Sequence, residues 1–144
     1  MKRLILILML LAGFITASAQ EGLNIATYFS QDFSKSGKVS SVTLSGNSAA
    51  KFGLDLYKSV TVVDNAIISS MEKAVKSDGT KAYDKQTAFR KGRLHFGFYA
   101  LKGKDCNRFI VFLNSGTDAD PKAMLIYMVG DASPEEVKKM MQKF

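Results

Sequence analysis

The chain has 144 residues, and 47% of them are hydrophobic, which suffices for one domain with its own core. It carries 20 Lys and Arg residues against 13 Asp and Glu, and most of the positive charge is lysine rather than arginine, the usual reader of phosphates and bases. With one Cys and one His, the chain can form neither an internal disulfide nor a zinc site of four nitrogen and sulfur ligands. Because lysine and not arginine carries most of the positive charge, nucleic-acid binding is not expected.

The first residues, MKRLILILMLLAGFITASAQ, have the pattern of a secretory signal. Lys2 and Arg3 precede a charge-free run, Leu4 to Ala17, of the length typical of a signal core (roughly 7–15 residues) and shorter than the ~20 residues of a membrane span. The small residues Ala17, Ser18 and Ala19 then offer a cleavage site. This pattern predicts a signal peptide over residues 1–19.

The mature chain is expected to be a single domain over residues 20–144. Without Lys2 and Arg3 it keeps 18 basic and 13 acidic residues, a net charge of +5. No Cys directly follows the apolar run, so a lipoprotein is not expected. We expect an exported protein, periplasmic or secreted, that is not integral to the membrane once the signal is cleaved.

The first half of the mature chain predicts a helix, two strands and a second helix. NIATYFSQDF repeats apolar residues at helical spacing through Ile25 to Phe33, with Asn24 as its cap and Gly37 as its end. VSSVTLSG and LYKSVTVVD alternate as strands, and residues 48–53 between them fit neither pattern.

The helix over residues 64–79, DNAIISSMEKAVKSDG, has the clearest pattern of the first half. Asp64 can cap its start, and Gly79 is expected to end it in the left-handed conformation. An apolar stripe through Ile68 and Met71 is expected to face the core, and Glu72 is expected to face solvent.

The second half predicts four strands and a terminal helix. KAYDKQTAF, RLHFGFYAL, NRFIVFLNS and KAMLIYMVG are the strands, and the nearly continuous apolar character of the last suits a central strand. RKG and KGKD are the turns of two hairpins. In SPEEVKKMMQKF, Ser133 is the expected N-cap and Glu136 completes a capping box.

This order predicts an α+β fold, a two-layer sandwich. Its mostly antiparallel sheet is expected to have about five to six strands, with helices near the N-terminus, in mid-chain and at the C-terminus.

His95 and Cys106, the only His and Cys, lie close enough in sequence to suggest a catalytic pair. A hairpin that turns at Gly103 and Lys104 would place Cys106 opposite Leu101, and would leave roughly 16 Å between His95 and Cys106 along the strands. A nucleophile and its base must lie within about 3 Å, so no dyad is expected. Cys106 alone could still be a modestly reactive surface thiol.

Acidic residues near the last strand are candidates for a metal or hydrolytic site. Asp118 and Asp120 alternate as in a calcium loop, but the glycine and the distal glutamate of such a loop are missing. Neither these residues nor Asp131 lies in an apolar setting that would raise a carboxyl pKa. No phosphate loop, dinucleotide fingerprint or serine elbow occurs either. We expect no catalytic residues, no metal ligands and no cofactor.

Basic residues concentrate in the predicted strands of the second half, where they could form a docking patch for an anionic glycan or lipid surface, or a solvated edge. They are Lys81, Lys85, Arg90, Lys91, Arg93, Lys102, Lys104 and Arg108. The best candidate interaction surface combines the face opened by Gly97 with the turn beside it. It comprises Gly97, Tyr99, Lys102, Lys104 and Arg108.

The signal ending ASAQ, the start GLNIATYF, the hairpin GFYALKGKDCNRFIVF and the ending LIYMVGDASPEEVKKMM give the chain a recognisable pattern. In this pattern the chain resembles small exported proteins of unknown function from Bacteroidota-type bacteria. The resemblance implies an envelope or secreted location and carries over no site residues.

The sequence therefore favours a non-catalytic module that binds an envelope protein or an anionic glycan or lipid surface. A small hydrolase or thiol enzyme, and a protease-inhibitor-like module, remain alternatives.

Overall fold

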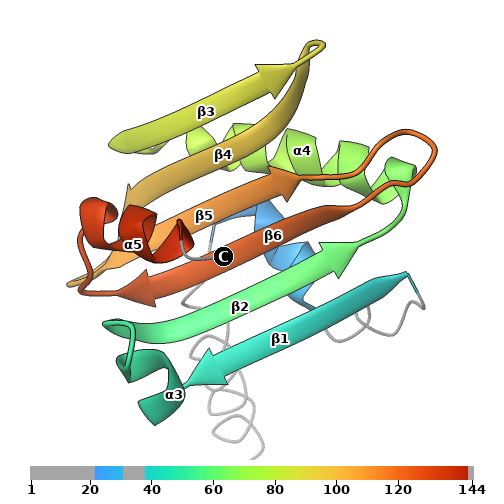
Figure 1. The fold of residues 1–144 in the computed structure, drawn as a ribbon. Helices are drawn as coiled ribbons and strands as arrows, with labels where there is room; N and C mark the ends of the chain where they lie inside the picture. Colours follow the sequence, from blue (N-terminus) through green and yellow to red (C-terminus); the bar gives the residue numbers. More distant parts are fainter. Residues whose placement is uncertain (1–21, 31–37, 143–144) are drawn as a thin grey trace, which may run out of the picture.

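The computed structural model describes residues 22–30 and 38–142. Ten elements follow one another along this part of the chain (Figure 1). They are the 3-10 helix η1 (Asn24–Phe29), β1 (Val39–Ser45), α3 (Asn47–Ala50), β2 (Leu54–Val62), α4 (Asn65–Gly79), β3 (Asp84–Arg90), β4 (Arg93–Lys102), β5 (Asn107–Asn114), β6 (Ala123–Gly130) and α5 (Pro134–Met141).

All six strands form one antiparallel sheet in the order β1-β2-β6-β5-β4-β3. Strands β3 to β6 follow one another as a meander, and the β1–β2 hairpin joins it where β2 pairs with β6 (Figure 1). The expected α+β class and antiparallel sheet are therefore observed. The apolar strand β6 is central, and its residues are buried on both faces, as Tyr127 and Met128 show.

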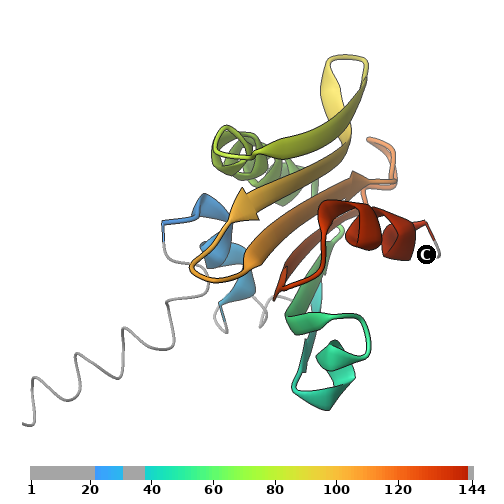
Figure 2. The ribbon, with the colours of Figure 1, turned by 90° about the vertical axis from the view of Figure 1, so that its left-hand side faces the viewer.

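Helices cover both faces of the sheet, so the expected two-layer arrangement is not confirmed. Helices α4 and η1 lie on one face and α5 lies on the other (Figure 2). The buried residues accordingly form two clusters, one around Met71 and Phe112 beneath α4, and one around Phe98 and Val137 beneath α5. An amphipathic pattern requires a helix to bury one face, but it does not say against which side of the sheet.

The N-terminal helix differs from its prediction. Residues Asn24–Phe29 form a 3-10 helix, and the N-cap position is Leu23, without a side-chain cap. Asn24 instead donates from its backbone N–H and its side chain to Asp78, and the Ile25 N–H donates to the same carboxylate at 2.9 Å. The predicted continuation through Phe33 to Gly37 lies outside the described residues.

Helix α4 begins as predicted, with the Asp64 side chain accepting a hydrogen bond from the Ile67 N–H at 3.1 Å. Its end is different, because Gly79 is the last helical residue and Thr80 follows in the right-handed conformation. The predicted left-handed glycine is therefore wrong. Glu72 also departs from its prediction, since it is buried, with 6% exposure.

The start of the C-terminal helix is as predicted, whereas the register of the β4–β5 hairpin is not. The Ser133 hydroxyl accepts from the Glu136 N–H at 3.2 Å and caps α5. The hairpin register differs by two residues, because Leu101 pairs with Arg108 rather than with Cys106. The turn is longer than expected, with Gly103 bonded to the Cys106 carbonyl and Asp105 at a φ of 60°.

Candidate functional site

The β3–β4 hairpin ends in a tight turn that displays basic side chains. Lys91 and Gly92 both have positive φ, 51° and 76°, in the pattern of a two-residue type I′ turn. Such turns match the twist of the flanking strands, and their second position favours glycine. The flanking residues Arg90 and Arg93 pair directly, so three cations lie within four consecutive residues.

A β-bulge lies just beyond this turn, at His95. Ala88 pairs with Phe96 and Phe89 pairs with Leu94, which leaves His95 as the extra residue on β4. β4 pairs with β5 only from Phe96 onward, although it pairs with β3 as far as Arg93. Because a bulge bends and twists its strand, the tip of the β3–β4 hairpin separates from the end of β5.

The loop between β5 and β6 forms the opposite wall. Its backbone is closed on itself, because the Ser115 and Gly116 N–H groups both donate to the Lys122 carbonyl at 3.0 Å. The Thr117 hydroxyl accepts from the Asp120 N–H at 3.0 Å. Asn65, the first residue of α4, donates to the Asp118 carbonyl at 2.9 Å and connects the loop to the helix.

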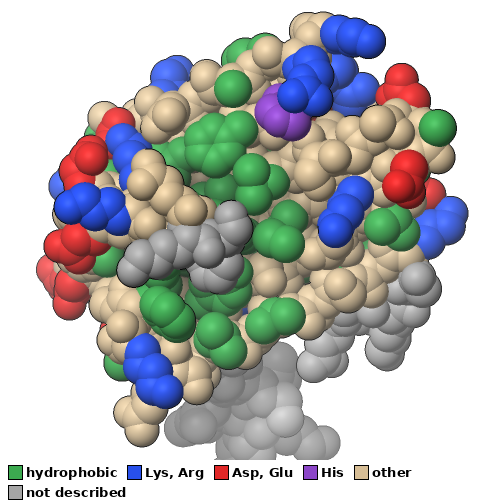
Figure 3. Space-filling model, in the orientation of Figure 1, with side chains coloured by type: hydrophobic (Ala, Val, Ile, Leu, Met, Phe, Trp, Pro, Cys, Tyr) green, Lys and Arg blue, Asp and Glu red, His purple; other side chains and the backbone are tan. Residues whose placement is uncertain are grey.

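Between these walls lies a cavity of about 420 Å³, open to solvent, which we call the basic cleft. Its main polar lining residues are Asn65, Arg90, Lys91, Arg93, His95 and Thr117. Figure 3 shows Lys and Arg side chains (blue) beside the His (purple) at this end of the molecule. Asp118 is the one acidic residue among the described residues that line the cleft.

A buried carboxylate positions one side of the basic cleft. Glu72 Oε2 lies 2.8 Å from Arg93 Nε, and Glu72 Oε1 accepts the Leu94 N–H. Arg93 also donates to the Ser69 hydroxyl at 3.2 Å. Helix α4 therefore fixes the first residues of β4, and with them the backbone that leads to His95.

Two of the three cations keep their charge unneutralised. No ion pair within the described ranges involves Arg90 or Lys91, and both are exposed. Arg93 shares its charge with Glu72. Three cations face one carboxylate, Asp118, so the formal charge of the cleft walls is positive.

The predicted exposure of Gly97 and Tyr99 is wrong. Tyr99 is 4% exposed, and burial raises the pKa of its phenol. A Cβ at Gly79 would lie 2.4 Å from the Tyr99 ring, and one at Gly97 would lie 2.7 Å from it. The two glycines thus let the ring lie flat between α4 and β4. These residues belong to the core and not to a surface.

The other residues of the predicted surface lie at the opposite end of β4. Lys102 and Lys104 are exposed, and the Lys102 ammonium lies 4.4 Å from the centre of the Tyr83 ring. Arg108 is half-buried and donates to the Lys102 carbonyl at 3.3 Å. The basic residues therefore form two groups at the two ends of the sheet rather than one patch.

His95 and Cys106 are also at opposite ends of β4. Cys106 faces Gly103 across the turn, and His95 is eight residues from Gly103, roughly 26 Å at about 3.3 Å per residue. Burial raises the pKa of the Cys106 thiol, although the nearby Arg108 charge acts in the other direction. The geometry thus separates the two side chains that a catalytic pair would need together.

The acidic candidates are dispersed as well. Asp118 lines the basic cleft, whereas Asp131 follows the far end of β6. Within the described residues, no group of three or more His, Cys, Asp and Glu side chains could hold a metal ion. In the same part of the chain, no helix is long and apolar enough to cross a membrane.

Sequence reasoning found the cations of the basic cleft but not the cleft itself. The sequence alone places Arg90, Lys91 and Arg93 in a larger basic set and predicts His95 on a regular strand. One pattern in the sequence points to the cleft: a RKGR turn is followed within two residues by the only histidine. The bulge that sets these residues opposite the β5–β6 loop depends on the register of two strands.

Comparisons with known proteins add one finding. No curated protein matches the chain, and no solved structure does. The model of a family of unknown function (DUF6108) matches residues 12–141, which is nearly the whole chain. The chain therefore belongs to this family of unknown function.

Proposed function

We propose that the protein is an exported, non-catalytic binding domain of the cell envelope that takes an acidic saccharide in the basic cleft. The observation that carries this proposal is a pair of exposed cations, Arg90 and Lys91, that form no ion pair within the described residues and that line a cavity of about 420 Å³.

Charge favours an anionic group as the ligand. Arg90, Lys91 and Arg93 outnumber Asp118 on the cleft walls, and a concave basic surface concentrates anions. The Arg93 guanidinium is fixed by Glu72 and Ser69, so its remaining N–H donors could bind a carboxylate with little loss of side-chain entropy.

The neutral polar groups favour a saccharide as the carrier of that anion. Asn65, Asn114 and Thr117 bring amide and hydroxyl groups to the same walls, and such groups pair with sugar hydroxyls. The volume lies within the range of about 300–1,000 Å³ that is common for small-molecule sites.

A catalytic function has less support. Paired-carboxylate hydrolysis needs two acidic groups, and Asp118 is the one acidic residue among the described residues lining the cleft. A thiol enzyme needs an activated Cys, whereas the pKa of Cys106 is raised and His95 is at the other end of β4.

The test is calorimetric titration of the mature chain, residues 20–144, with tetragalacturonate and with a neutral hexose tetrasaccharide. We expect binding of the acidic sugar alone, weakened as salt is raised. The double variant R90Q/K91Q should bind it roughly tenfold or more weakly, since about 1.4 kcal/mol corresponds to tenfold.

The matched control removes the same charge from the other end of the sheet. K102Q/K104Q should bind the acidic sugar as the parent does. Equal losses in both double variants would indicate a general charge effect and contradict the site. Binding of anionic lipid vesicles but not of the acidic sugar would assign the basic cleft to a membrane surface instead.

A further inference from the structure

The two edge strands of the sheet differ in how they are protected. β3, on one edge, carries Asp84, Lys85 and Arg90 among its seven residues. β1, on the other edge, is also seven residues long and reads VSSVTLS, without a charge or a proline. Edge strands usually avoid pairing with other chains by means of charges, prolines or bulges. Strand β1 has none of these, and its register with β2 is continuous.

The hydrogen-bond pattern shows which backbone N–H and C=O groups of β1 point away from β2. The Val63 N–H donates to the Lys38 carbonyl, in register with the β1–β2 ladder. Because bonded and non-bonded pairs alternate in an antiparallel ladder, the even-numbered residues of β1 bond to β2. The N–H and C=O groups of Val39, Ser41, Thr43 and Ser45 therefore point outward.

We propose that β1 pairs antiparallel with β1 of a second copy of this chain, about a two-fold axis at Val42. In this register Ser41 bonds to the partner's Thr43, and Val39 bonds to the partner's Ser45. Every outward-pointing group of the strand is then paired. The result is one continuous sheet through both subunits, and the interface uses the same patch twice.

The side chains suit this register. Val42 is 53% exposed and would meet the partner's Val42 in a non-hydrogen-bonded pair, where the two Cα atoms approach to about 4.5 Å. Ser40 would lie opposite the partner's Leu44 on the same face. No like charges oppose each other, because Lys38, just outside the strand, pairs with Asp64 of its own chain at 2.9 Å.

This inference does not rest on the proposed function, because the basic cleft lies where β3 and β4 turn, toward the other edge of the sheet. The test is sedimentation equilibrium of the mature chain over a range of concentrations, for the parent, V42K and T87K. Thr87 is exposed at the middle of β3, so T87K places the same charge on the opposite edge.

We expect a monomer–dimer equilibrium for the parent and for T87K. V42K should raise the dissociation constant roughly tenfold or more, because it puts two like charges directly opposite each other. Thermal unfolding of V42K compared with the parent at low concentration checks that the monomer folds. A parent that stays monomeric at about 1 mM, or a dimer equally stable in V42K and T87K, would overturn the proposal.

A crosslinking experiment tests the register itself. In a C106A background, V42C should form a disulfide between subunits on mild oxidation, since the expected Cα spacing lies within the usual 4.4–6.8 Å range of disulfides. S41C is the matched control, because Ser41 faces the partner's Thr43 and not its own equivalent. Efficient crosslinking of S41C without V42C would exclude the axis at Val42.

Discussion

At the residue scale, the carboxylate of Glu72 holds the first residues of β4 beside the basic cleft. Its side chain is 7% exposed, and it accepts both the Leu94 N–H and the Arg93 Nε–H. Lys76, one helical turn away, lies 3.9 Å from the same carboxylate and contributes little at that distance. A buried carboxylate without its hydrogen-bond donors destabilises the fold, and so do buried donors that have lost their carboxylate.

Removal of Glu72 should therefore destabilise the fold. We expect E72A to lower the free energy of unfolding by about 3 kcal/mol, because it leaves the buried Leu94 N–H without an acceptor. E72Q should lose less, since its amide oxygen can still accept that bond. Urea denaturation measures both changes, and K76Q is the control, with an expected change below about 0.5 kcal/mol. A loss in E72A no greater than that in K76Q would contradict this role.

Cys106 gives a prediction about pH. Because burial raises its pKa, the folded protein should have a smaller thiolate fraction at a given pH than an ordinary thiol. The rate of iodoacetamide alkylation should reach half its maximum above the ordinary value of about 8.5, and should return toward that value in urea. In R108Q the midpoint should rise further, since the Arg108 charge lowers the pKa. A folded-state midpoint below the value in urea would indicate an activated thiol.

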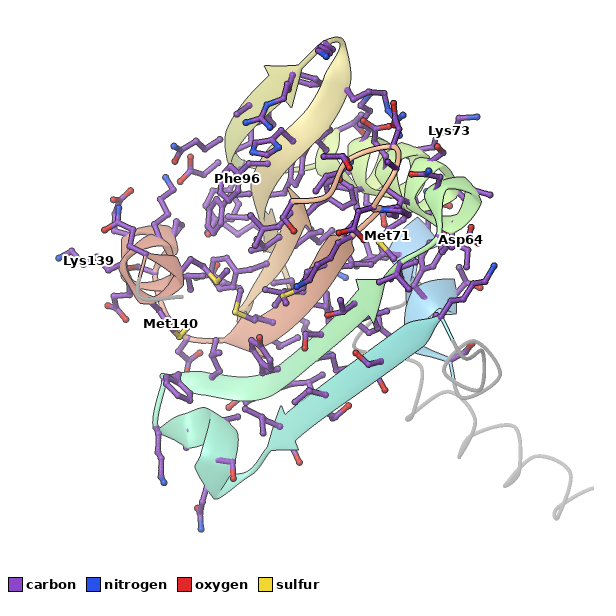
Figure 4. All side chains as sticks on the ribbon, turned by 45° about the vertical axis from the view of Figure 1, so that its right-hand side comes forward. Asp64, Met71, Lys73, Phe96, Lys139 and Met140 are labelled. Atoms are coloured by element: carbon purple, nitrogen blue, oxygen red, sulfur yellow. The ribbon has the colours of Figure 1, made fainter. Side chains whose placement is uncertain are left out.

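At the element scale, η1 is fixed to the rest of the domain by the end of α4. Asp78 is 3% exposed and accepts three hydrogen bonds from Asn24 and Ile25, at 2.8 to 3.0 Å. Ile25 and Tyr28 are buried in the cluster beneath α4, and Figure 4 shows Met71 between that helix and the sheet while Lys73 points away. A short 3-10 helix has little stability alone, so the carboxylate determines its position.

We expect D78A to release η1 before the sheet unfolds. The amide protons of Asn24 and Ile25 should lose their protection from hydrogen exchange, and global stability should fall by about 2 kcal/mol, because both N–H groups lose a charged acceptor. S77A is the control, since the Ser77 hydroxyl accepts from the exposed Asn24 side chain at 3.0 Å and does not contact the backbone N–H groups of η1 in the described residues. Unchanged protection at Ile25 in D78A would show that apolar packing alone holds η1.

The elements could be predicted where the sequence encodes them locally. Runs of apolar residues mark β4 and β5, and Asp64 and Ser133 cap the helices that follow them. Burial of Glu72 could not be predicted, because its acceptor role depends on the start of β4, more than 20 residues later. The side of the sheet that each helix covers is likewise decided by packing and chain direction.

At the scale of the whole molecule, the basic cleft depends on contacts between residues far apart in the sequence, and local patterns do not predict such contacts. The basic residues could be identified, and a hairpin of this length already implies that Arg93 and Lys102 lie roughly 30 Å apart. Tyr99 was expected on a surface because the alternation of β4 reveals its face but not the helix packed on it. The basic cleft depends on the bulge at His95, which both strands of the hairpin determine together.

The measurement that tests the central claim most directly is mapping of backbone amide chemical shifts of residues 20–144 during titration with tetragalacturonate. The largest changes should occur at residues 90–95 and 114–118, the two walls of the basic cleft, and they should be absent with the neutral tetrasaccharide. Changes concentrated at residues 102–108, or no saturable changes at low salt, would contradict a binding function for the basic cleft.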